Sequence, residues 1–163
     1  PQILQIGTGH NKNLQSVIPA LTSINCKLII VGKLNSFYLD LLQKNNIDYE
    51  NYFDVDLDTL ISLYAKSDIV SFVSYSEGFG LPIIEAMKLS CPVFCSNTSS
   101  MIEIADNNAF LFDPYEIDSF LSVFDKNSNI DNLSNKKNQA RIYAQKFTWD
   151  QCALETRKIY NEI

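Results

Sequence analysis

The sequence predicts an α/β protein built on a doubly wound parallel sheet of about six strands. Short β-rich runs alternate with segments of helical periodicity, as they do in successive strand–helix–strand units. Most of the runs are apolar along their whole length, which is typical of parallel strands buried on both faces. The predicted strands are residues 2–6, 27–31, 69–73, 92–95 and 109–112, with a weaker candidate at 49–53.

The segments between these strands place apolar residues on one face of a helix. Pro19 falls inside the first such pattern, so we expect this helix to be kinked or to start late. Thr148 is placed to cap the last helix. The clearest periodic sets are Leu57, Leu60, Ile61 and Tyr64, then Ile117, Phe120, Leu121 and Phe124, and then Trp149, Cys152, Ala153, Thr156, Ile159 and Tyr160.

Two capping boxes predict further helix starts. One spans residues 113–116 (Asp-Pro-Tyr-Glu) and has its proline at the first helical position. The other spans residues 100–103 (Ser-Met-Ile-Glu) and explains Glu103 without a functional role. Between residues 126 and 138 the chain is rich in Asn, Ser and Lys, which predicts a loop between helices.

Length, composition and charge narrow the class of protein. A chain of 163 residues suits a single domain spanning 1–163, and a hydrophobic fraction of 46% is enough for a sizeable core. The net charge of -6 argues against nucleic-acid binding. No apolar run approaches the roughly 18 residues of a membrane span, and no signal peptide is visible. The chain opens inside a predicted strand at Pro1, so we expect it to be a piece of a longer protein.

The cysteine pattern gives no sign of a metal site. No two cysteines form a C-x-x-C pair, and the chain has one histidine, so a zinc site is not expected. We interpret the cysteines as ordinary buried thiols in a reducing cytoplasm. They are Cys26, Cys91, Cys95 and Cys152.

The loop after the strand at 69–73 is the strongest candidate for a binding site. Residues 74–82 read Ser-Tyr-Ser-Glu-Gly-Phe-Gly-Leu-Pro, and a helical segment follows. Glycines on both sides of Phe79 allow the backbone to turn sharply and to come close to a ligand. Pro82 suits the first turn of the helix. The amides of residues 79–81 would then form an anion site at the helix N-terminus.

Two carboxylates, Glu77 and Glu85, flank this anion site. Carboxylates repel phosphate but accept hydrogen bonds from sugar hydroxyls. A diphosphate with a sugar on each side would therefore use the amides and both carboxylates. Two alternatives stay open: residues 74–77 also match a capping box, and Glu85 could simply complement the dipole of its own helix. A helix that began at Ser74 would run into Gly-Phe-Gly-Leu-Pro, a poor helix interior.

The loop after the first strand, residues 7–13, is the second candidate. Asn13 is placed to cap the following helix. Lys12 then lies at the positive end of that helix dipole, where it calls for a nearby anion such as a phosphate. A lysine that reaches into water is the alternative. His10 is either an acid or base, or an exposed loop histidine without a role.

The same region argues against NAD. Gly7-x-Gly9 lacks the third glycine of the dinucleotide-binding motif. The strand at 27–31 is followed by Gly32-Lys33 and not by the acidic residue that would hold an adenosine ribose. A phosphate-binding function without NAD is therefore favoured.

Taken together, these residues resemble the C-terminal domain of the large retaining glycosyltransferase family numbered four, which has the two-domain, Rossmann-like GT-B fold. The resemblance covers nearly the whole chain. Its most specific part is the Glu-x7-Glu motif of Glu77 and Glu85 in the setting Glu-Gly-Phe-Gly-Leu-Pro…Glu-Ala-Met. Other matching segments are Ile6-Gly7 with Lys12-Asn13, Leu28–Gly32, Leu60–Tyr64, Ser67-Asp68, Cys91–Val93, Ser99-Ser100 with Glu103, Leu111–Pro114 and Phe147–Trp149.

The resemblance implies a domain that binds a nucleotide-diphosphate sugar for retaining, metal-independent transfer to an acceptor. The donor is expected to be a UDP- or GDP-linked hexose, with no metal and no cofactor. Glu77 matches the position that holds the donor sugar, Glu85 the position that binds the ribose, and Lys12 a diphosphate-binding lysine. The implied donor-binding residues are Gly7, Lys12, Gly78, Phe79, Gly80, Leu81 and Glu85, and the implied catalytic residue is Glu77.

The resemblance also implies a missing half. Family members have an N-terminal domain that binds the acceptor and closes over the donor, and nothing in residues 1–163 corresponds to it. We expect a glycan or lipid-linked acceptor to bind there, and a cytoplasmic protein with peripheral contact at the inner face of the membrane through that domain. Alone, residues 1–163 are expected to bind a nucleotide weakly and not to transfer sugar.

One departure from the family keeps alternatives open. Many members carry an arginine directly after the first-strand glycine, where this chain has Thr8, so one cation is missing unless Lys33 or a residue outside the chain replaces it. A degenerate, non-catalytic nucleotide-binding or scaffold module is therefore one alternative. A hydrolase that uses Glu77 and Glu85 as acid and base is another, although a glycosidase has no use for an amide-lined anion site.

Overall fold

The computed structural model, which describes residues 1–162, confirms the predicted fold class. Its six strands form one fully parallel sheet in the order β3-β2-β1-β4-β5-β6. From β1 the chain winds outwards to β2 and β3, then returns to the centre at β4 and winds the other way. The strands are β1 (Gln2–Ile6), β2 (Lys27–Val31), β3 (Tyr49–Tyr52), β4 (Ile69–Phe72), β5 (Val93–Ser96) and β6 (Phe110–Phe112).

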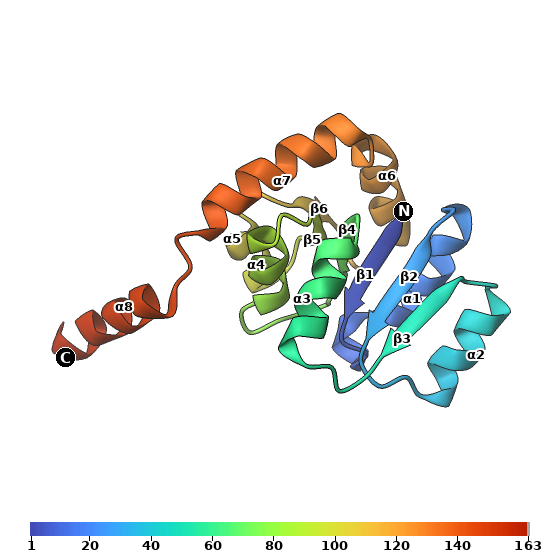
Figure 1. Ribbon diagram of the computed structural model, residues 1–163, viewed down its shortest axis with the longest axis horizontal. Helices are drawn as coiled ribbons and strands as arrows, with labels where there is room; N and C mark the ends of the chain where they lie inside the picture. The colour runs from blue at the N-terminus through green and yellow to red at the C-terminus, as the bar shows by residue number, and fades with distance from the viewer. Residues whose placement is uncertain (163) are drawn as a thin grey trace.

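Helices cover both faces of the sheet (Figure 1). Helices α3 (Leu57–Lys66), α4 (Leu81–Lys88), α5 (Ser100–Ala105) and α7 (Ile130–Ala144) pack on one face, and α1 (Leu14–Ala20), α2 (Ser36–Lys44) and α6 (Ile117–Asn127) on the other. The second face has an aromatic core in which the ring of Phe94 contacts those of Phe110, Phe120 and Phe124. Both faces of the sheet are thus dry, which explains why the strands are apolar throughout.

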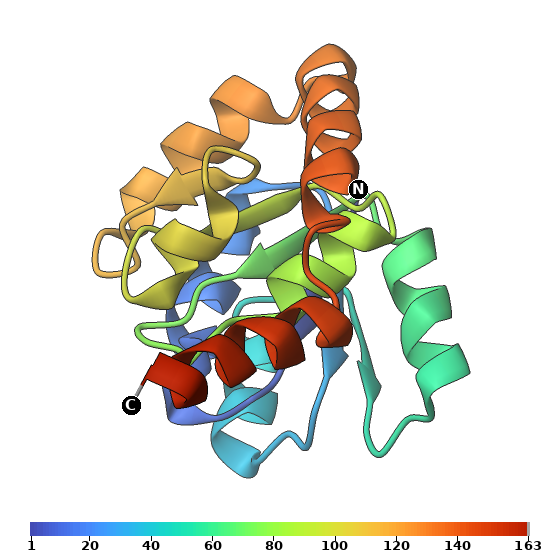
Figure 2. The ribbon, with the colours of Figure 1, turned by 90° about the vertical axis from the view of Figure 1, so that its left-hand side faces the viewer.

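The last helix, α8 (Trp149–Glu162), projects away from the sheet in Figure 1 and lies in front of it, towards the viewer, in Figure 2. The predicted cap is confirmed, because the amide of Gln151 donates to Oγ1 of Thr148 at 3.1 Å. None of the residues of α8 is buried, and Trp149 and Tyr160 are 80% and 76% exposed. Within the part of the chain that the structure describes, none of the helices combines the length and the apolar character that a membrane crossing requires.

The prediction of a loop at 126–138 was wrong. Helix α6 continues to Asn127 and α7 begins at Ile130, so two residues connect them. Oδ1 of Asn129 caps α7 by accepting from the amide of Asn132 at 2.9 Å. Helix α7 packs on the core through two small buried residues, Ala140 and Ala144. The polar composition reflects the solvent-facing sides of the helix and not a loop.

Both capping-box predictions were also wrong. Helix α6 begins at Ile117, and Oδ1 of Asp113 accepts from the amide of Tyr115 at 2.9 Å, so Asp113 closes a turn before the helix. Helix α5 already includes Ser100, whose hydroxyl points to the loop after β4 and not to its own helix. In each case a tertiary or turn hydrogen bond replaced the expected cap.

Helix α1 does not start late, which was one of the two possibilities predicted from Pro19. It starts at Leu14 and places Pro19 in its last turn, after which the chain tightens into the 3₁₀ turn η2 (Leu21–Ser23). The carbonyl of Pro19 accepts from the hydroxyl of Thr22 at 2.7 Å. The proline therefore ends the α-helix.

The cysteines are free, and they differ in exposure more than the sequence suggested. Cys91 and Cys95 are buried as expected, but Cys26 is half-buried and Cys152 on α8 is exposed. Burial raises the pKa of the Cys91 and Cys95 thiols to about 12. Both thiols therefore stay protonated and unreactive at neutral pH.

We predict that a maleimide reagent at pH 7.5 labels Cys152 first, Cys26 more slowly, and Cys91 and Cys95 only after denaturation. The physical reason is that the thiolate is the reactive species and must be reachable. Mass spectrometry of peptides from a labelling time course measures the order. Labelling of Cys95 in the folded protein as fast as Cys152 would contradict the burial of β5.

Candidate functional site

The candidate site lies where the winding of the sheet reverses, between β1 and β4. Ligands of open α/β sheets bind outside the carboxyl ends of the strands at such a point. The loop after β1 carries Gly7 and the 3₁₀ turn η1 (His10–Lys12), and the loop after β4 carries Glu77. The two loops are joined by a hydrogen bond from the amide of Tyr75 to the carbonyl of Asn11, 2.8 Å long. The two segments singled out from the sequence are therefore neighbours.

The ammonium group of Lys12 forms an ion pair with Glu77, with 2.6 Å between Nζ and Oε1. The two side chains are only 18% and 15% exposed. The Lys12 ammonium also lies 4.7 Å from the centre of the Phe72 ring, and Nδ2 of Asn11 is 3.4 Å from the same Glu77 oxygen. The alternative of a lysine that reaches into water is therefore wrong, and the anion beside Lys12 is a carboxylate of the protein.

Gly7 makes room for this lysine. It has φ +88, and a Cβ on it would lie 2.9 Å from Cε of Lys12. A larger residue would both strain the backbone and push the lysine away. Asn13 does not cap α1 as predicted: it has φ 53, and its Nδ2 donates to the carbonyl of Pro114 at 3.0 Å.

The loop after β4 forms the turn that the sequence predicted. No helix begins at Ser74, so the alternative capping box at 74–77 is wrong. Helix α4 begins at Leu81, Gly80 precedes it with φ +104, and Pro82 lies in its first turn. Within residues 1–162, the amides of 78–81 donate to no backbone or side-chain acceptor. A Cβ on Gly78 would meet nothing within 4 Å, so the space beside this amide is open.

Glu85 lies one turn into α4, and a hydroxyl that the sequence did not indicate holds it. Tyr64 of α3 donates from its hydroxyl to Oε2 of Glu85 at 2.8 Å. Tyr64 is only 1% exposed, and burial followed by the charge of Glu85 raises the pKa of its hydroxyl, which remains a donor. One carboxylate oxygen is thereby fixed and the other is left for another partner, which goes beyond complementing the helix dipole.

Ser99 and Ser100 matched the family in the sequence, but no role in the site was assigned to them. The hydroxyls of Ser99 and Ser100, after β5, both donate to the carbonyl of Glu77, at 2.9 and 3.0 Å. A cluster of hydroxyl residues directly after a strand was the available signal, since the carboxyl ends of all six strands share one edge. Such contacts become visible only once the strand order is known.

Thr8 and His10 interact with Lys33 and Tyr75, respectively, and not with the two carboxylates. The Thr8 hydroxyl donates to the carbonyl of Lys33 at 2.8 Å and so joins the loops after β1 and β2. His10 is exposed, and its ring lies 6.2 Å from that of Tyr75, which stacks on Tyr115 at 5.2 Å. Within residues 1–162, His10 forms no ion pair and no hydrogen bond with Glu77 or Glu85.

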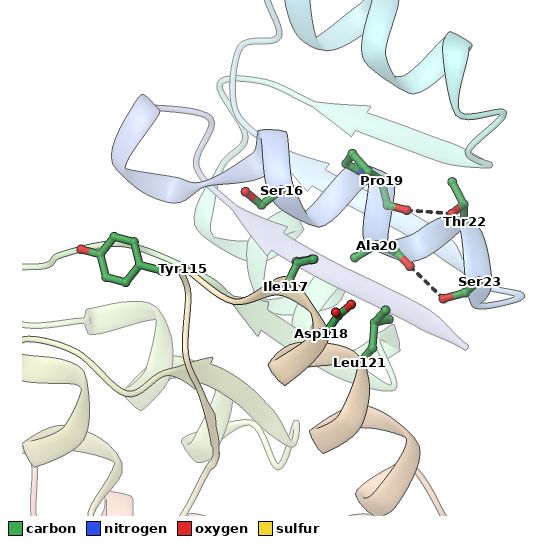
Figure 3. A pocket seen from close by; sticks show the side chains of 9 residues that line it. All are labelled: Ser16, Pro19, Ala20, Thr22, Ser23, Tyr115, Ile117, Asp118 and Leu121. Carbon is green, nitrogen blue, oxygen red and sulfur yellow. Dashed lines mark hydrogen bonds between the residues drawn. The ribbon is translucent and has the colours of Figure 1, made fainter.

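A hollow of about 500 Å³ lies elsewhere, between α1 and α6 (Figure 3). Its walls include Pro19, Ile117 and Leu121, and none of the predicted site residues lines it. We locate the site by its charges and free amides, because this mainly apolar hollow has no cation in its lining and its one charged lining residue, Asp118, would repel an anion. Within residues 1–162, no three His, Cys, Asp or Glu side chains are grouped so that they could hold a metal ion.

The sequence from residue 1 to 147 matches the family model of the glycosyl transferases group 1. The chain belongs to this family. It is 36% identical over 100 residues to O-antigen chain mannosyltransferase B of Escherichia coli, covering 60% of this chain and 26% of that protein. It is 29% identical over 157 residues to the O-antigen biosynthesis glycosyltransferase WclY of Escherichia coli, covering 93% and 44%. The chain spans less than half the length of these relatives.

Solved structures share the fold. Sucrose-phosphate synthase of Thermosynechococcus elongatus superposes with a TM-score of 0.87 at 20% identity, over 99% of this chain and 45% of that one. HepE of Anabaena, solved in complex with UDP and glucose, superposes with a TM-score of 0.80 at 18% identity, over 99% and 48%. The predicted Rossmann-like architecture of GT-B glycosyltransferases is confirmed. The family number and the retaining mechanism stay predictions.

We predict that Lys12→Met lowers the free energy of unfolding by about 1–3 kcal/mol, because it leaves a largely buried carboxylate without its cation. Adding Glu77→Gln recovers part of this loss, so the two effects are not additive. Urea denaturation of the single and double variants measures the coupling.

The control for this prediction is a second ion pair of the same length. Lys27 and Glu50 are also 2.6 Å apart but are 35% and 44% exposed. Lys27→Met should therefore cost less stability than Lys12→Met, because water and salt screen the exposed pair. Equal losses for the two lysine variants would show that burial adds nothing to the pair at the site.

Proposed function

We propose that this chain is the donor-binding domain of a retaining glycosyltransferase and that the carboxyl edge of the sheet at β1 and β4 binds a nucleotide-diphosphate sugar. One observation carries the proposal: a mostly buried Lys12–Glu77 pair lies beside unbonded amides at the start of α4. A lysine, free amides and a helix N-terminus together suit a diphosphate. The family membership and the UDP and glucose in the complex of HepE support the same class of donor.

Each group has a part in the proposed reaction. The amides of residues 78–81 and the Lys12 ammonium stabilise the negative charge that grows on the departing diphosphate, in place of a metal ion. Glu77, once released from Lys12, accepts hydrogen bonds from the donor sugar and is the catalytic residue of the proposal. Glu85 binds the ribose through the oxygen that Tyr64 does not occupy.

Exchange of partners is the central step of donor binding in this proposal. Lys12 is 18% exposed and needs an anion beside it in every state. Glu77 supplies that anion before the donor arrives, and the diphosphate supplies it afterwards. The exchange leaves neither charge without a partner, because sugar hydroxyls then satisfy Glu77.

Other parts of the proposal rest on the resemblance. The acceptor, a glycan or lipid-linked molecule, would bind to an N-terminal domain outside residues 1–163, and the donor would be a UDP- or GDP-linked hexose. Residues 1–163 alone would then bind a nucleotide without transferring sugar. O-antigen glycosyltransferases among the relatives support a role in glycan synthesis.

A non-catalytic module is the second candidate, and Thr8 is the observation that favours it. Its hydroxyl is bonded to the Lys33 carbonyl, and it brings no charge to the loop after β1. Thermal shift with UDP, GDP, ADP and their sugars separates the candidates. A sugar nucleotide that stabilises the protein favours the transferase, and the absence of any shift favours the scaffold.

We predict that Glu85→Gln weakens binding of the preferred nucleoside diphosphate about three- to tenfold, because a charge-assisted hydrogen bond to the ribose is lost. The melting temperature should stay near that of the wild type, since the amide oxygen still accepts from Tyr64. Calorimetric titration measures the affinity, and Glu103→Gln on the neighbouring helix α5 is the control.

A second pair of variants separates binding from structure. Glu85→Ala leaves the buried Tyr64 hydroxyl without an acceptor and should lower stability. Adding Tyr64→Phe removes that hydroxyl and should restore part of the stability but none of the affinity. Restored affinity in the double variant would show that Glu85 is only a structural partner of Tyr64.

We predict that Gly78→Ala blocks donor binding without affecting the fold. Its Cβ would enter open space, so the free energy of unfolding should change by less than about 0.5 kcal/mol. Affinity for UDP, GDP or ADP should fall because the methyl group occupies the approach to the amide. Gly80→Ala is the contrasting variant: with φ +104 it should lose about 1–3 kcal/mol of stability. Wild-type affinity in Gly78→Ala would contradict the location of the site.

A further inference from the structure

Three consecutive hydroxyl residues after β5 bind three alternate carbonyls of the loop after β4. The hydroxyl of Thr98 donates to the carbonyl of Tyr75 at 3.0 Å. Ser99 donates to the carbonyl of Glu77 at 2.9 Å. The Ser100 hydroxyl lies 3.0 Å from the carbonyls of both Glu77 and Phe79. The contacts therefore follow the loop at every second residue.

These bonds fix the direction of the amides as well as the carbonyls. In a planar trans peptide unit, the C=O of one residue and the N–H of the next point in opposite directions. Carbonyls of Tyr75, Glu77 and Phe79 that point to the hydroxyls therefore turn the amides of Ser76, Gly78 and Gly80 away from them. The amides of Gly78 and Gly80 are among those that bind nothing within residues 1–162.

The opposite side of the loop supports this arrangement. Nδ2 of Asn11 lies 3.4 Å from the carbonyl of Ser76, the residue between two clamped carbonyls. The loop is thus held from both sides by alternate peptide groups. The amides of residues 78–81 stay without a partner within residues 1–162.

Ser99 adopts a backbone conformation that suits glycine better than serine. Its φ is 56° and its ψ is −148°. A side chain at such a position strains the backbone. The hydrogen bond of the Ser99 hydroxyl to the donor loop offsets this strain.

We propose that Thr98, Ser99 and Ser100 form a hydroxyl clamp, which orients the amides of Gly78 and Gly80 towards the diphosphate before the donor binds. The inference rests on the proposed function, since the ligand is the same. The three residues are positioning residues, because they act on the loop backbone and not on the donor. Amides oriented in advance bind an anion without a further ordering cost.

The test compares Ser100→Ala with the conservative Ser100→Thr, and Thr98→Val with Thr98→Ser, in the full-length protein. Matched controls lie at the other end of the sheet. Ser23 and Thr22 donate from their hydroxyls to the carbonyls of Ala20 and Pro19 at 3.0 and 2.7 Å. Ser23→Ala and Thr22→Val therefore remove the same kind of hydrogen bond away from the donor loop.

Two measurements are made on each variant. Limited chymotrypsin digestion without ligand, with the cut identified by mass spectrometry, gives the rate of cleavage after Phe79, which is 45% exposed. Calorimetric titration with UDP, GDP and ADP, and with the matching monophosphates, gives the affinities. We expect Ser100→Ala and Thr98→Val to raise the cleavage rate and to weaken diphosphate binding about three- to tenfold. Monophosphate binding should fall less, and the hydroxyl-retaining variants should behave as wild type.

The outcomes are distinguishable. Unchanged cleavage in both hydroxyl-free variants would overturn the clamp. Faster cleavage with unchanged diphosphate affinity would overturn its role in donor binding. If the wild type binds none of the nucleotides, the proposed function fails, and the cleavage rates alone then decide whether the three hydroxyls hold the loop.

Discussion

The parallel pairing of β1 with β4 is the constraint on which the rest of the structure depends. Ile3 lies opposite Ile69 and Leu4 opposite Val70, although more than sixty residues separate them in the chain. This register brings the loops after the two strands together at the carboxyl edge, and with them Lys12 and Glu77. The helices pack on the two faces of the sheet, so this edge is not covered by either layer. The site is therefore a consequence of strand order.

The charges of the site follow from its partial burial. A lysine beside the Phe72 ring and a carboxylate with 15% exposure would each be costly alone, and together they are neutralised at short range. A chain with a net charge of -6 would otherwise repel a diphosphate. Binding of the proposed sugar nucleotide thus depends on hydrogen-bond donors at the site itself, namely one lysine and the amides that precede α4. The hydrogen bond from the Tyr64 hydroxyl to one carboxylate oxygen stabilises Glu85 at its position.

The sequence was sufficient for features that depend on local pattern and insufficient for those that depend on strand order. All six strands, the turn at Gly78–Leu81 and the proline of α4 follow from periodicity and backbone preferences. Two of the failures share a cause: Ser100 and Asn13 were interpreted as helix caps because their tertiary acceptors were unknown. The polar composition of residues 126–138 also led to a wrong prediction of a loop. These residues lie largely in helix α7, which packs on the core through two buried alanines further along. Tyr64 was recognised as a core residue, but its hydrogen bond to Glu85 joins two helices whose packing the sequence pattern does not specify.

The backbone of the donor loop shows how a segment with few reactive side chains can become an anion site. Every peptide group carries a donor and an acceptor, so a free loop offers both signs of partial charge to a ligand. Hydroxyls from residues 98–100 occupy the carbonyls of Tyr75, Glu77 and Phe79, which removes acceptors that would repel an anion. The amides of the same peptide units, those of Ser76, Gly78 and Gly80, point the other way and remain available to an anion. Side chains that never touch the ligand would in this way determine the sign of the charge that the loop accepts.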